Sequence, residues 1–124
     1  PPRSTLFPYT TLFRSTQRVD ILGHATVIPS YDELHGTSFL TQWEDAVIAL
    51  CKKYDIALEI SGLWRAPGVD VLRRAHEAGL KFSMGSDCHD PIQIGNLAYV
   101  EQMITELDLQ PEDFFVPKRQ LSFD

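Results

Sequence analysis

Asp87 and His89 stand two positions apart, directly after a short apolar run that ends at Met84. A strand that ends in Asp-x-His brings an oxygen ligand and a nitrogen ligand to one end of a sheet, and zinc and harder divalent ions both accept such a pair. A second apolar run, over residues 19–23, ends in the same way at His24. We therefore predict a hydrolytic metal site with His24, Asp87 and His89 as its ligands.

A third apolar run, over residues 56–60, carries polar residues with alternative roles. Glu59 either orients a ligand histidine or forms an ion pair with Arg65, and the ion pair is the simpler interpretation. Arg65 either holds a substrate phosphate through charge-assisted hydrogen bonds or stays a solvated loop residue. Ser61 is a candidate hydrogen-bond donor, so the predicted substrate-binding residues are Arg65 and Ser61. Cys88 has no base spaced for thiolate chemistry and is interpreted as a small filler.

The elements that must position these residues alternate between strands and helices. We predict strands over residues 20–23, 56–60 and 81–84, and helices over residues 41–54, 69–78 and from 90 to about 110. Thr41 and Glu44 form a capping box for the first helix, and Asp90 before Pro91 caps the last. This order predicts an α/β fold with parallel strands and right-handed crossovers. The carboxyl ends of parallel strands share one edge, so the candidate residues are expected to converge there.

The composition excludes several classes of function. The chain has 124 residues, 44% of them hydrophobic, which is one domain or part of one. A net charge of −6 leaves no basic stripe for a nucleic-acid backbone. Cys51 and Cys88 stand far apart, and no secretory signal or long apolar span is visible. We therefore expect a cytoplasmic protein with no nucleic-acid or membrane contact.

The first fifteen residues differ from the rest of the chain. They contain Arg3 and Arg14 but no acidic residue, and they show no clean period of a helix or a strand. Residues 5–15 resemble one translated frame of a short-read sequencing adapter. We therefore interpret residues 1–15 as artefactual, assign the domain to residues 16–124, and expect the natural protein to have had more chain before Thr16.

Three segments resemble the late motifs of PHP-domain proteins (polymerase and histidinol phosphatase). They are residues 20–24, residues 57–61 and residues 82–91, and the resemblance extends from Val19 to about Leu109. It implies the C-terminal β/α units of a distorted TIM-like (β/α)7 barrel, here incomplete. It also implies a phosphoesterase of the histidinol-phosphatase type, with two or three divalent metal ions (Zn, Mn or Fe) and a small phosphorylated substrate.

The resemblance also implies residue roles. His24, Asp87 and His89 match positions of metal ligands, and Arg65 lies in a loop whose arginines are plausible phosphate contacts. The chain departs from the family pattern because the opening His-x-His motif and the ligands after it are missing. Ser61 stands where asparagine is frequent, and Cys88 where alanine is frequent.

These departures predict a fragment that is inactive alone. Two alternatives remain open: a metal-dependent barrel hydrolase of the amidohydrolase type, and a non-catalytic accessory PHP domain of a larger protein. The amidohydrolase alternative is distinguished by its later ligands and by any bridging lysine.

Overall fold

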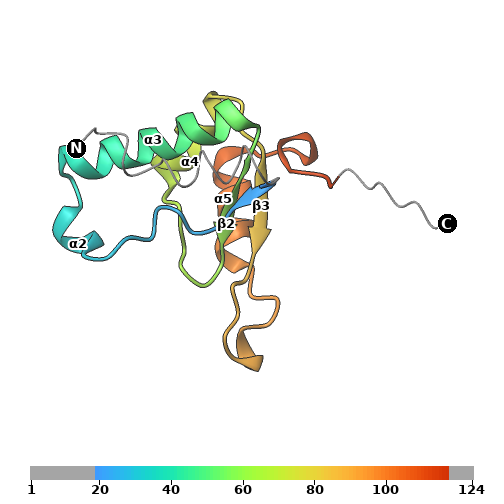
Figure 1. Ribbon diagram of the computed structural model, residues 1–124. Coiled ribbons are helices and arrows are strands. Elements are labelled where there is room, and N and C mark those ends of the chain that lie inside the picture. The colour runs from blue at the N-terminus through green and yellow to red at the C-terminus, as the bar shows by residue number, and fades with distance from the viewer. Residues whose placement is uncertain (1–18, 118–124) are drawn as a thin grey trace.

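The computed structural model describes residues 19–117 as a small parallel sheet with helices packed against it (Figure 1). The strands are β1 (Ile21–Leu22), β2 (Ala57–Ser61) and β3 (Phe82–Gly85), in the order β1-β2-β3. Both strand pairs are parallel, with Leu22 opposite Leu58 and Leu58 opposite Phe82. The prediction of an α/β fold with parallel strands is confirmed.

The helices alternate with these strands along the chain. They are α2 (Tyr31–Leu34), α3 (Ser38–Tyr54), α4 (Val69–Glu77) and α5 (Ala98–Leu107). Two 3-10 turns complete the order, at Pro91–Gln93 and Pro111–Asp113. Within residues 19–117, no helix has the length and apolar character needed to cross a membrane.

One apolar core holds the strands in place. Leu58 and Ile60 from β2 and Phe82 from β3 have no exposed surface. They belong to a cluster that also contains Val47 of α3, Leu72 of α4 and Val100 of α5. Burial of such side chains contributes about 1.5–3 kcal/mol each. The core therefore fixes the strands and, with them, the positions at which the strands end.

The first long helix begins earlier than its sequence predicts. Thr37 caps α3, because its side-chain oxygen accepts a hydrogen bond from the backbone N–H of Leu40 at 3.4 Å. The predicted capping box of Thr41 and Glu44 is therefore wrong. Glu44 is buried and bonds to Arg74 of α4 instead, so tertiary pairing overrides a plausible local cap.

The last helix begins later than predicted. Asp90 does act as a cap, since its carboxylate accepts from the N–H of Ile92 at 3.0 Å, but it caps only the turn Pro91–Gln93. Gly95 then adopts a φ of +71°, which interrupts the helical path before α5 starts at Ala98. The connection between β1 and α3 contains one short helix, α2.

Candidate functional site

The loops after the strands emerge at one end of the sheet (Figure 1). The loop after β2 is tied to the end of β3, because the N–H of Gly62 donates to the carbonyl of Gly85 at 2.7 Å. The N–H of Leu63 donates to the carbonyl of Ser86 at 3.2 Å. The two loops that carry most of the candidate residues therefore have a fixed relation to each other.

Glu59 lies at the centre of this edge, between two glycines. A Cβ atom on Gly23 would come within 2.5 Å of its Oε2, and a Cβ atom on Gly85 within 2.5 Å of its Oε1. The carboxylate thus occupies the space that the absence of a side chain at both glycines leaves open on the neighbouring strands. This arrangement follows from the register, because Gly23 comes directly after Leu22, the partner of Leu58.

The electrostatics of Glu59 connect it to two predicted ligands. Burial raises the pKa of Glu59, the nearby His24 imidazole lowers this pKa, and the Asp87 carboxylate raises it. The charges of His24 and Asp87 therefore act on the same carboxylate. His24 after β1 and Asp87 after β3 therefore both lie close enough to Glu59 of β2 to influence its charge.

Trp64 connects the same residues from the loop after β2. Its Nε1–H donates to Oδ2 of Asp87 at 2.6 Å, and its ring centroid lies 6.4 Å from that of His24. No signal in the sequence identifies Trp64 as a site residue. The contact joins residues 23 positions apart through two loop conformations, and neither loop conformation has a sequence motif that predicts it.

The backbone at this edge is unusual as well. Six non-glycine residues among 19–117 have positive φ, and three of them are His24 (31°), Arg65 (49°) and Asp87 (48°). Such conformations cost about 1–3 kcal/mol each and gather at functional sites. The left-handed backbone at His24 and Asp87 sets the direction in which each side chain leaves the end of its strand.

His89 belongs to the turn that follows Asp87. Its Nδ1 lies 2.7 Å from the backbone carbonyl oxygen of Asp87, and its N–H donates to Oε1 of Gln93 at 2.9 Å. A histidine whose Nδ1 bonds to a carbonyl keeps Nε2 for a metal. The set of His24, Glu59, Asp87 and His89 has the imidazole and carboxylate chemistry that zinc, manganese and iron accept. Within residues 19–117, however, no three His, Cys, Asp or Glu side chains gather closely enough to hold an ion.

Ser61 does not have the predicted role. Its side chain has no exposed surface, and its Oγ accepts from the backbone N–H of Trp64 at 3.4 Å. Its own N–H donates to the carbonyl of Ala66 at 2.8 Å. Ser61 therefore shapes the loop after β2, and its burial leaves the predicted contact with substrate without an exposed surface to make it.

Within the described part of the chain, Arg65 does not form the ion pair with Glu59 that the sequence predicts. Its guanidinium lies 5.4 Å from the ring centroid of Tyr99, and the described residues include no ion pair between Arg65 and Glu59. The predicted ion pair is wrong, because the Glu59 carboxylate lies between the two glycines instead. Arg65 borders a cavity of about 210 Å³ that is also lined by Ser86, Asn96 and Tyr99, so it remains available to an anion.

Glu59 gives the folded chain a pH dependence. A carboxyl with a raised pKa lowers stability as the pH rises above its ordinary value of 4.5, because the unfolded chain releases the proton first. Glu59→Gln removes this loss. We expect the metal-free variant to gain stability at pH 7, by less than about 1 kcal/mol since partial contact with water weakens the penalty. Urea unfolding at pH 4 and pH 7 checks this, and a gain that is larger at pH 4 contradicts it.

The two cysteines are expected to differ in reactivity. Burial raises the pKa of the Cys51 thiol to about 11, whereas Cys88 is exposed beside Asp87 and does not act as the predicted filler. Because the thiolate is the reactive form, Cys88 should react with a chromogenic disulfide at pH 8 at least about 100-fold faster than Cys51. Stopped-flow measurements on Cys88→Ser and Cys51→Ser identify each phase. Equal rates in the native chain would refute the assignment.

Comparison of the chain with models of protein families, with curated proteins and with solved structures found no match.

Proposed function

We propose that this chain is the C-terminal part of a metal-dependent phosphoesterase that resembles PHP-domain enzymes. The three β/α units would be the last part of a TIM-like (β/α)7 barrel. The observation that carries the proposal is the position of Glu59, between the two glycines at the ends of β1 and β3 and within the fields of His24 and Asp87. A carboxylate desolvated beside an imidazole and a second carboxylate is the kind of group that a cation stabilises.

In this proposal, His24, Asp87 and His89 would hold the metal. A bound divalent ion would supply a water of lowered pKa and positive charge for phosphoryl oxygens. Glu59 keeps the ligands oriented, and Trp64 holds Asp87 through the bond to its Oδ2. Arg65 donates hydrogen bonds to phosphoryl oxygens from the edge of the 210 Å³ cavity.

The proposed centre needs more ligands than residues 19–117 supply. The resemblance implies that they come from earlier strands of the barrel, so this chain alone would hold one ion weakly and turn over no substrate. The amidohydrolase alternative would use the same edge, with Asp87 activating the water. No contact of the described residues favours it over the phosphoesterase.

A non-catalytic accessory domain is the second candidate. The Trp64–Asp87 hydrogen bond favours it, because that bond uses one oxygen of the best candidate ligand. In that case the edge of the sheet would be a polar network that fixes the loops. Trp64→Phe distinguishes the two, since it should lower metal affinity where Trp64 orients Asp87 as a ligand and should only loosen the loops in a structural network.

Calorimetric titration with Mn²⁺ and Zn²⁺ tests the proposal. We expect one weak site per chain, whose affinity falls at least about tenfold in Asp87→Asn and His24→Gln. His35→Gln is the matched control, because His35 is an exposed histidine on the connection after α2. Binding that is equal in all variants, or turnover of an aryl phosphate at the 1–10³ s⁻¹ typical of complete enzymes, would overturn it.

A further inference from the structure

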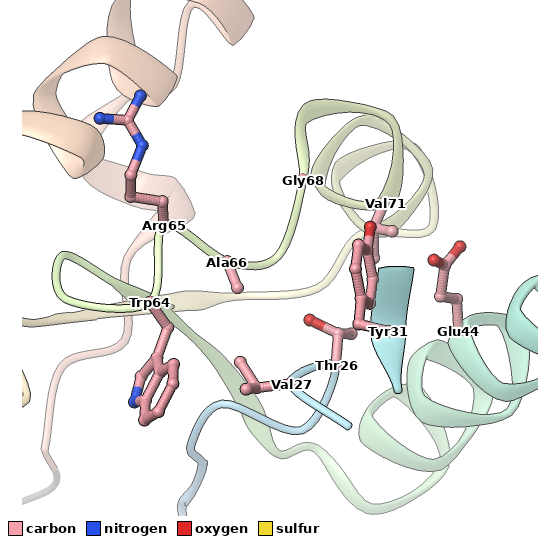
Figure 2. A pocket seen from close by; sticks show the side chains of 9 residues that line it. All are labelled: Thr26, Val27, Tyr31, Glu44, Trp64, Arg65, Ala66, Gly68 and Val71. Atoms are coloured by element: carbon pink, nitrogen blue, oxygen red, sulfur yellow. The ribbon is translucent and has the colours of Figure 1, made fainter. Parts of the chain in front are cut away.

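A second cavity, of about 230 Å³, lies beside the candidate site (Figure 2). The loop after β1 and the loop after β2 form part of its wall. Methyl groups of Val27 and Val71 and the rings of Tyr31 and Trp64 make the lining mainly apolar. Flat aromatic walls suit a small flat ring. Because Trp64 also bonds to Asp87, this cavity and the candidate metal edge share a wall.

Thr26 is the most informative polar residue of this cavity. Only 4% of its surface is exposed, and within the described part of the chain its hydroxyl has no hydrogen-bond partner. Figure 2 shows this hydroxyl on the side of the residue that faces Ala66 and Val27. A buried hydroxyl without a partner is costly, and such groups are rare in folded proteins. A ligand in the cavity would supply the partner.

The charges around the cavity favour a neutral ligand. Glu44 contributes a carboxylate whose side chain is 10% exposed, but Arg74 donates to its Oε2 at 2.5 Å and neutralises it. The guanidinium of Arg65 points away from the cavity in Figure 2 and lies over Tyr99. With the Glu44 carboxylate paired and the Arg65 guanidinium directed away, an ionised ligand inside the cavity would find no counter-charge close by. The remaining Glu44 oxygen and the Thr26 hydroxyl can both accept a hydrogen bond.

We propose that this cavity binds a small neutral aromatic alcohol, with its ring between Trp64 and Tyr31 and its hydroxyl bonded to Thr26. Under the proposed function this ring is the organic part of an aryl phosphate, whose phosphoryl group reaches the candidate metal edge past Trp64. That assignment rests on the proposed phosphoesterase. Binding of the ring itself does not, because it needs no metal.

NMR titration with phenol tests the proposal on the metal-free full chain. We expect a saturable shift of the Trp64 indole N–H and a smaller one for Trp43, whose Nε1–H donates to Ala25 and which does not line the cavity. Phenol should bind more tightly than cyclohexanol, which is not flat, and at least about tenfold more tightly than benzoate, which is ionised.

Thr26→Val removes the hydroxyl and keeps the shape, so phenol affinity should fall about three- to tenfold. Thr105→Val is the matched control, because the exposed Thr105 hydroxyl lies on α5, where it donates to the carbonyl of Glu101. Val27→Phe, checked for folding by the NMR spectrum, should fill the cavity and abolish binding.

Unchanged affinity in Thr26→Val, or binding of benzoate as tight as that of phenol, would overturn the proposal. Phenol binding without any metal site would leave this inference standing while the phosphoesterase fails. A metal site without phenol binding would overturn this inference and leave the proposed phosphoesterase standing.

Discussion

Phe82→Ala is expected to lower the free energy of unfolding by about 3–5 kcal/mol. Phe82 has no exposed surface, and it packs in the core between β2 and the helices. Its removal leaves a cavity that rigid neighbours such as Leu58 and Leu72 cannot fill. A small domain has only about 5–15 kcal/mol of total stability, so this one substitution would remove a large share of it.

Met84→Ala is the matched control for this prediction. Met84 lies two positions along the same strand but is 45% exposed, so its loss should cost less than about 1 kcal/mol. Denaturant unfolding followed by circular dichroism measures both. Equal effects of the two substitutions would mean that β3 is not packed as described.

Arg74→Met should cause the second largest loss, about 2–3 kcal/mol. Arg74 of α4 bonds to both Glu44 and Asp45 of α3 and thereby joins the two helices. The Glu44 side chain is only 10% exposed, so removal of the guanidinium leaves a desolvated charge without a partner. The expected loss is below that of a fully buried pair because the Arg74 side chain is 34% exposed.

The neighbouring arginine provides the control. Arg73 pairs with Asp70 at 2.9 Å, but these side chains are 49% and 85% exposed, so Arg73→Met should cost less than about 0.5 kcal/mol. In the double variant Arg74→Met with Glu44→Leu, most of the lost stability should return. If the double variant is as unstable as the single one, Arg74 acts through its packing and not through the charge of Glu44.

Periodicity and strand order were sufficient to predict the α/β fold and the parallel sheet. The short apolar runs predict the three strands to within two residues, although only β2 is buried along most of its length. The start of α3 was missed because Glu44 pairs with Arg74, thirty positions away. The start of α5 was missed because cap chemistry at Asp90 is the same for a single turn and for a long helix.

The candidate site was predictable in position but not in detail. Parallel topology placed the strand ends together, so His24, Glu59 and Asp87 were expected at one edge. The sequence does not specify where side chains in loops point, and the Trp64–Asp87 bond and the burial of Ser61 depend on that. Gly23 and Gly85 were the available signal, since two glycines at the ends of the strands that flank Glu59 leave room for its carboxylate.

The strand-end side chains are proposed to act as one cation-binding edge. Titration of the ¹⁵N-labelled chain with Mn²⁺, followed by paramagnetic broadening of its amide signals, locates a bound ion directly. We expect selective broadening at residues 23–25, 59–61 and 85–89, with the helical amides of α3 retained and the effect lost in Asp87→Asn. Broadening centred on the surface carboxylates of α5, or spread evenly over the acidic surface, would contradict the proposed metal edge.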